Sequence, residues 1–190
     1  MSQALAPSTS QSMADPGASR RQADILSLDQ VKAMLAMDDG FAGEFGILAP
    51  YLRKATATWA QEIPRRIVVD ETTQDAMTIR DLNRLSRYVE IFVTEMTLGQ
   101  FGSNFEAALD GIAVIMRKHG INPCWATAPL ALAFDAAQQQ IYSETRNTNN
   151  RVFPAALRCI TKIAALSIHI LGRRDHELNE ATPQIGAPIT

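Results

Sequence analysis

The amino-acid sequence predicts a single all-α domain, and three observations lead to this prediction. Apolar residues recur at steps of three and four almost throughout the chain, as they do on the buried face of a helix. Residues that cap helices stand just before several of these stretches. The 190 residues, of which 46% are hydrophobic and 20% are charged, suffice for one compact core.

The two ends of the chain differ in composition from the region between them. Residues 1–23 are mainly Ser, Ala, Pro and Gln with almost nothing to bury, which predicts a disordered leader. Residues 175–190 have a similar composition and predict a flexible tail. The predicted domain therefore spans residues 24–174.

Three helix starts are predicted from a hydroxyl side chain that precedes an acid or amide by three residues, because such pairs satisfy free N–H groups of the first turn. The pairs are Ser27 with Gln30, Thr78 with Asp81, and Ser103 with Glu106. A fourth start is predicted at Asn122-Pro123, a cap residue followed by proline at the first helical position, where its missing N–H is not needed.

Two further segments complete the expected five or six helices. Pro50 predicts the opening or a bend of a helix that carries residues 51–63. The segment from Arg151 to Gly172 predicts a long final helix that glycine ends. The run from Arg66 to Val69 resembles a strand, but it lacks a second strand to pair with, so a loop or helix end is favoured.

Two of the predicted helices have a clear buried face. In residues 78–98 this face consists of Ile79, Leu82, Leu85, Val89, Phe92 and Met96. In the following helix it consists of Phe105, Leu109, Ile112, Met116 and His119. Met116 and His119 are therefore predicted to point to the same side of the helix within one turn of each other.

The last two helices have apolar residues that spread more widely than a single stripe. They include Trp125, Leu130, Leu132, Phe134 and Ile141 in the first helix, and residues from Val152 to Leu171 in the second. This spread predicts a second buried face on both helices, packed against another subunit.

Composition excludes several classes of function. The net charge of −2 provides no basic surface for nucleic acid, and neither a secretory signal nor an apolar run for a membrane span is evident, so a cytoplasmic protein is predicted. The two cysteines, Cys124 and Cys159, have no paired spacing and are interpreted as reduced, buried thiols. Catalytic motifs are absent, which predicts that the protein is not an enzyme.

The segment from Gly111 to Trp125, Gly-Ile-Ala-Val-Ile-Met-Arg-Lys-His-Gly-Ile-Asn-Pro-Cys-Trp, resembles the proximal segment of the globin-coupled sensor and protoglobin families. The segment from Arg151 to Leu171 resembles their closing helix, and the segment from Ile79 to Gly99 resembles the helix across their haem pocket. The resemblance covers roughly residues 24–174. It implies a globin-like helical sandwich that binds haem b, senses a diatomic gas and dimerises through its last two helices.

The chain departs from the family pattern at the positions that matter for haem. Met116 stands where the proximal histidine is expected, and Trp59 aligns with a frequent distal tyrosine. The thioether of Met116 can bind haem iron. His119, one turn later on the same side, is an alternative ligand, because imidazole also binds haem iron. Each residue has a second interpretation. His119 suits a helix C-terminus, where it can bond open carbonyl groups, and Met116 suits ordinary core packing.

Two hypotheses for the function follow from the sequence. In the first, the protein is a haem-binding sensor of a diatomic gas that uses His119 or Met116 and signals through a separate partner protein. In the second, the pocket has lost its haem, and the domain is a dimerisation or interaction module. The replaced proximal residue favours the second hypothesis, but the resemblance to sensor globins over most of the chain makes haem sensing the leading prediction and the haem-free module the alternative.

Overall fold

Seven α-helices and one 3-10 helix make up almost all of the described part of the chain, which in this computed structural model covers residues 26–67, 77–147 and 151–181. These residues include no strand. The elements are α2 (Leu28–Met34), α3 (Asp39–Ala55), α4 (Trp59–Ile67), α6 (Ile79–Leu98), α7 (Ser103–Lys118), η1 (Pro123–Ala126), α8 (Thr127–Thr145) and α9 (Val152–Ala181). The prediction of a single all-α domain is confirmed, with seven α-helices in place of five or six.

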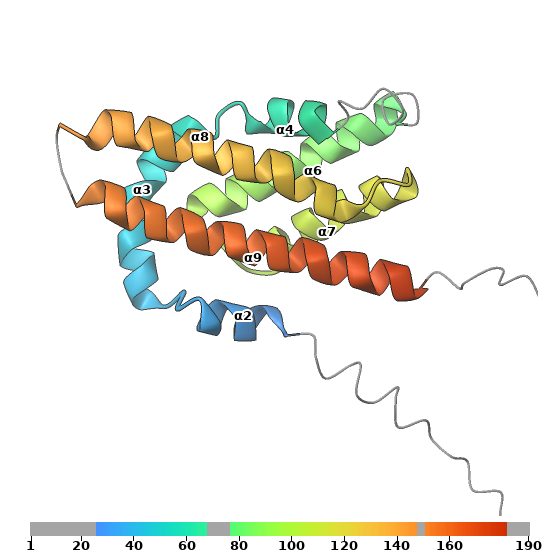
Figure 1. The fold of residues 1–190 in the computed structure, drawn as a ribbon, viewed down its shortest axis with the longest axis horizontal. Helices are drawn as coiled ribbons and strands as arrows, with labels where there is room; N and C mark the ends of the chain where they lie inside the picture. The colour runs from blue at the N-terminus through green and yellow to red at the C-terminus, as the bar shows by residue number, and fades with distance from the viewer. Residues whose placement is uncertain (1–25, 68–76, 148–150, 182–190) are drawn as a thin grey trace, which may run out of the picture.

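The helices form two layers. Helices α8 and α9 lie side by side and antiparallel, and the pair of α6 and α7 lies behind them (Figure 1). Helix α3 crosses one end and contacts α6, α8 and α9, whereas α4 packs between α6 and α8. The short α2 contacts α9 on the opposite edge. The core fills the space between these layers.

The predicted caps of three helices are confirmed. The Ser27 hydroxyl accepts a hydrogen bond from the Gln30 N–H at 3.3 Å, and the Gln30 side chain accepts one from the Ser27 N–H at 2.8 Å. The Thr78 hydroxyl accepts from the Asp81 N–H at 3.2 Å. The Asn122 side chain accepts from the Cys124 N–H at 2.8 Å and caps the 3-10 helix that leads into α8.

The cap predicted at Ser103 is wrong. Ser103 is already helical, and Gly102 stands at the cap position without a side-chain hydrogen bond. The acid of the predicted pair, Glu106, pairs with Arg173 of α9. A distant ion pair therefore engages the side chain that would have completed the local capping motif.

The helix predicted around Pro50 is divided into two. Helix α3 begins after Asp38, whose carboxylate accepts from the Phe41 N–H at 3.1 Å, and Pro50 lies inside this helix. It ends at Ala55, where the buried Thr56 hydroxyl donates to the Arg53 carbonyl at 3.5 Å. Threonine side chains that bond the backbone in this way compete with helix continuation, and α4 starts only at Trp59.

The final helix extends beyond its predicted end. Gly172 is an interior residue of α9, which continues to Ala181, so the first part of the predicted tail is helical. A glycine inside a helix costs about 1 kcal/mol relative to alanine. The ion pairs that follow Gly172, described below, offset this cost. Residues 1–25 and 182–190, which include the predicted leader and the rest of the tail, lie outside the described residues, as do Val68 and Val69.

The buried face of α6 differs from the predicted one in its first turn. Leu85, Val89, Phe92 and Met96 are fully buried as predicted, but Ile79 is 78% exposed. Asp81 takes the inward position in its place and is only 2% exposed. The buried face of α6 therefore includes the Asp81 carboxylate in its first turn, and a pattern of apolar residues does not reveal this.

Among the described helices, α9 alone has the length and composition of a membrane span: within Val152–Leu178, an 18-residue window has a mean hydropathy of 1.4. This differs from the prediction that the chain has no apolar run of that length. Half of this window is buried inside the fold. Such burial is typical of the central helix of a globular domain.

Candidate functional site

Two of the three predicted haem-contacting residues are part of the hydrophobic core. Met116 of α7 is fully buried in the main cluster of apolar side chains. Trp59 opens α4 and is 3% exposed. Its ring packs edge-on against Phe134 of α8, with 5.3 Å between the ring centroids. Both side chains thus fill space between helices.

His119, the third predicted residue, contacts a buried carboxylate. It follows α7 at the C-cap position, and its side chain is 9% exposed. The Nε2 atom of His119 lies 3.0 Å from Oδ2 of Asp81 at the start of α6. Lys118 Nζ donates to the same oxygen at 2.8 Å, and the Thr78 hydroxyl donates to it at 2.9 Å. The His119 side chain therefore joins two helices, and its Nε2 contacts Asp81 instead of an open carbonyl of α7.

Helices α6 and α7 pack against each other at several points, and a small open pocket of about 270 Å³ lies between them on the outer side. Beyond the Asp81–His119 contact at one end, the Tyr88 ring covers the backbone of Gly111 so closely that an added Cβ would lie 2.5 Å from it. Further along, the rings of Phe92 and Phe105 have their centroids 5.3 Å apart. At the other end, Asn104 Nδ2 lies 3.4 Å from Glu95 Oε1.

This seam does not fit a haem between α6 and α7. The porphyrin ring of the resembled families would need these two helices to stand apart, with an imidazole nitrogen directed at the iron. Here side chains from both helices touch at several points of the seam, and His119 Nε2 faces Asp81. The packing of these two helices therefore does not favour the haem binding that the sequence predicts.

The pKa of Asp81 predicts how acid affects stability. Hydrogen bonds from Lys118, Thr78 and His119, in that order of importance with burial opposing them, hold the pKa of the Asp81 carboxyl well below its usual range. A lowered pKa in the folded state stabilises the fold above the unfolded value of about 3.9. This contribution is lost as the pH falls from there toward the folded pKa.

The corresponding experiment compares Asp81→Asn with the wild type in urea unfolding between pH about 3 and pH about 7. The variant is expected to be less stable at neutral pH, and its deficit is expected to shrink below pH about 4. Asp39→Asn is the control, because Asp39 also stands in a first helical turn but has no side-chain partner among the described residues. A deficit that stays constant down to the lowest pH would contradict this account.

The two cysteines have different surroundings. Cys159 of α9 is fully buried as predicted, but Cys124 in η1 is exposed, because Pro123 and Ala126 are the residues of this turn that face inward. Burial, with a smaller effect of the Glu44 charge, raises the pKa of the Cys159 thiol to about 11. At neutral pH this thiol is therefore protonated and shielded, and a thiol reagent requires the thiolate.

A thiol titration checks the burial of Cys159. In a Cys124→Ser variant at mildly alkaline pH, we expect no reaction with a disulfide reagent in the native state. One thiol per chain should react after denaturation in urea. Rapid modification of the native variant would show that α9 does not bury Cys159.

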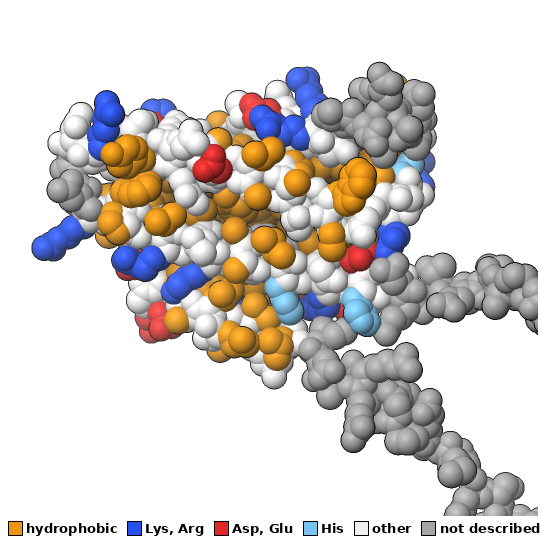
Figure 2. Space-filling view, viewed as in Figure 1, with side chains coloured by type: hydrophobic (Ala, Val, Ile, Leu, Met, Phe, Trp, Pro, Cys, Tyr) orange, Lys and Arg blue, Asp and Glu red, His pale blue; other side chains and the backbone are white. Residues whose placement is uncertain are grey.

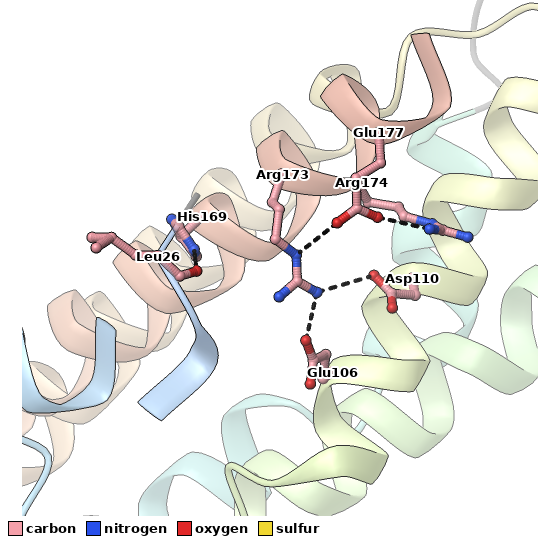
Figure 3. Close-up of polar contacts among 7 residues, drawn as sticks. All are labelled: Leu26, Glu106, Asp110, His169, Arg173, Arg174 and Glu177. Atoms are coloured by element: carbon pink, nitrogen blue, oxygen red, sulfur yellow. Dashed lines mark hydrogen bonds and ion pairs between the residues drawn. The ribbon is translucent and has the colours of Figure 1, made fainter. Parts of the chain in front are cut away.

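Ion pairs fasten the end of α9 to α7. Figure 3 shows the guanidinium group of Arg173 directed at Glu106 and Asp110 of α7, with Glu177 next to it on α9. Arg174 Nη1 also reaches Glu177 at 2.7 Å, and a further pair joins Arg117 to Asp175. On the other side of α9, His169 Nε2 lies 3.3 Å from the Leu26 carbonyl oxygen. These contacts explain why the helix remains docked beyond Gly172.

The outer side of α8 and α9 is apolar. Figure 2 shows hydrophobic side chains spread over these two helices, with charged side chains mostly around them. We name this surface the α8–α9 face. Its members on and before α8 are Trp125, Ala128, Leu132, Ala136, Gln139 and Tyr142, and those on α9 are Pro154, Leu157, Thr161, Ala165 and Ile168. They repeat at three and four residues; the charged side chain among them is Asp135, which is exposed on the same side of α8 and accepts a hydrogen bond from Gln139 Nε2 at 2.8 Å.

The two helices of this face pack side by side. At one end of the face, the Tyr142 ring of α8 and the Phe153 ring of α9 have their centroids 5.0 Å apart. The exposed side chains include Leu132 at 57% and Ile168 at 49%. The predicted second apolar face of the last two helices is thus present, and it is open in the single chain.

Helical spacing does not reveal that Asp81 contacts His119, or that Tyr142 and Ile168 are exposed members of the α8–α9 face. Comparison with known proteins does not add a family: no family model matches the sequence, and no match was found among curated proteins or solved structures. The geometry of the described residues is therefore the basis for a functional proposal.

Proposed function

We propose that this domain is a haem-free dimerisation and interaction module that pairs with a second copy of itself through the α8–α9 face. The observation that carries the proposal is the row of large exposed hydrophobic side chains along two long neighbouring helices, with Asp135 as the charged side chain among them. Large exposed apolar patches that have a polar surround are typical of protein interfaces. Two such helix pairs, packed around a two-fold axis, would form a four-helix bundle.

The size of the face supports a second copy as the occupant. Its five large side chains, Trp125, Leu132, Tyr142, Leu157 and Ile168, are between 39% and 59% exposed. Together they present roughly 500 Å² of surface, and the small residues between them bring the face close to the ~800 Å² per partner of a stable interface. Most of the face is uncharged, and the Asp135 carboxylate is already hydrogen-bonded to Gln139, so an identical surface would meet mainly apolar side chains.

From the resemblance to sensor globins, the proposal keeps the helical fold and leaves out the haem. Seven helices with a long antiparallel final pair support a globin-like sandwich, whereas the seam between α6 and α7 does not fit the haem of those families. A module of this kind would act by bringing two copies together and by contacting a separate partner. We propose no catalytic reaction for it.

Sedimentation velocity on the full-length protein tests the dimer directly. At micromolar concentration the protein is expected to sediment as a dimer, and dilution is expected to shift it toward the monomer by mass action. A monomer at all concentrations would overturn the proposal.

A visible spectrum tests the haem-free part of the proposal. Protein purified from cells grown with ample haem precursor is expected to be colourless, and added haemin should not bind stoichiometrically. A Soret band that moves with carbon monoxide would restore the gas-sensor hypothesis. Single substitutions of His119 and Met116 would then identify the iron ligand.

A further inference from the structure

A groove of about 620 Å³ is formed by α2, α3 and the end of α6, and none of the residues that line it belongs to the α8–α9 face. One face of α3 provides its long wall, from Asp38 through Ala42, Gly46 and Ala49 to Arg53. This wall is about 22 Å long at 1.5 Å per residue. The volume falls within the range of small-molecule sites.

The floor of the groove is aromatic but does not offer a free ring face. Phe41, Phe45 and Phe101 pack against one another with centroids 5.6 to 5.9 Å apart, and each is only 5% to 7% exposed. A flat aromatic ligand would find no ring to stack on. A thin aliphatic chain can instead lie along the ring edges and over the small side chains of Ala42 and Gly46.

The charges at the two ends of the groove differ. Near the start of α3, Asp38 and Asp39 stand beside Lys32, which pairs with Asp29 at 3.4 Å. At the other end Arg53 is exposed, and its guanidinium group has no hydrogen-bond or ion-pair partner among the described residues. An anionic head group is therefore repelled at the acidic end and finds a donor at Arg53.

We propose that this groove binds a linear aliphatic carboxylate, with its head group at Arg53 and its chain along α3 toward Phe41, Phe45 and Phe101. The site is separate from the α8–α9 face, so that dimerisation and ligand binding can be tested independently. An extended dodecanoate is shorter than the groove and serves as the probe.

Glycine positions in α3 offer a matched pair of variants. A Cβ added at Gly46 or at Gly43 would meet no atom within 4 Å, so both helical positions accept a larger side chain without a clash. Both glycines are exposed, but only Gly46 lines the groove. Gly46→Leu should fill the groove, whereas Gly43→Leu should leave it open. Ala42→Leu is a second filling variant should Gly46→Leu fail to fold.

Calorimetric titration of the full-length protein with dodecanoate below its micellar concentration tests the proposal. Gly46→Leu is expected to weaken binding by roughly tenfold or more because it displaces the chain from apolar surface. Arg53→Gln should weaken it by roughly threefold to tenfold through loss of an exposed charged partner. Gly43→Leu and Arg66→Gln, which changes an exposed arginine in the last turn of α4, should bind as the wild type does.

Three results would overturn the proposal. The first is the absence of dodecanoate binding to the wild type. The second is tighter binding of dodecylamine than of dodecanoate, which would place a cation at Asp38 and Asp39. The third is an equal loss of affinity in Gly43→Leu and Gly46→Leu, which would locate the ligand elsewhere. A Leu132→Glu variant that still binds dodecanoate would show that the ligand does not lie on the α8–α9 face.

Discussion

Replacing Leu132 with glutamate is expected to convert the dimer into a monomer. Leu132 is exposed in the middle of the α8 part of the α8–α9 face. Across a two-fold axis each substitution enters the interface twice, so two carboxylates would be buried without partners. A loss of about 3 kcal/mol would raise the dissociation constant by roughly 100-fold. Sedimentation velocity at equal concentrations of variant and wild type measures this shift.

The control for this prediction is Ile79→Glu. Ile79 is 78% exposed at the start of α6 and does not belong to the α8–α9 face, so its change to glutamate tests the general effect of removing a surface hydrophobic residue. This variant should remain dimeric. Ile168→Glu, on the α9 half of the same face, should behave like Leu132→Glu. If Leu132→Glu and Ile79→Glu sediment identically, the α8–α9 face is not the interface.

Features that depend on residues close in sequence were predictable. The caps at Ser27, Thr78 and Asn122 form because donor and acceptor are two or three residues apart and the helix start brings them together. The buried part of α6 from Leu85 onward follows from helical spacing alone. In both cases the geometry of the helix itself determines which side chain caps it or is buried, and no contact with a distant residue changes this.

Features that depend on distant contacts were not predictable in the same way. Glu106 fits a local cap by its spacing, yet it pairs with Arg173, which is 67 residues away. Gly172 is a residue type that often ends a helix, but ion pairs between α9 and α7 keep α9 helical beyond it. A sequence pattern gives the options of each residue. It does not give the relative strength of a contact that only the tertiary fold creates.

The functional residues show the same limit. Spacing predicts that Met116 and His119 share one side of the helix. It does not indicate that the His119 side chain contacts the carboxylate of Asp81, which lies 38 residues earlier. Periodicity likewise assigns Trp125 and Leu132 to an apolar set without telling a core position from an interface position. The groove along α3 depends on three segments that meet only in the folded chain.

Met116→Ala is expected to lower the free energy of unfolding by about 2–5 kcal/mol, because it removes a fully buried side chain and leaves a cavity. Met116→Leu keeps the volume and should lose less than about 1.5 kcal/mol. Met34→Ala is the matched control, since Met34 is 73% exposed in α2, and it should change stability by no more than about 0.5 kcal/mol.

Urea unfolding at one fixed protein concentration measures these differences without a contribution from dimer dissociation that varies between samples. The comparison also distinguishes the two interpretations of Met116. A methionine that packs the core is replaceable by leucine and not by alanine, because volume is what it contributes. A methionine that lines an open cofactor pocket would tolerate alanine almost as well as Met34 does. Equal losses of stability in Met116→Ala and Met34→Ala would therefore favour an open pocket beside α7, as porphyrin binding requires.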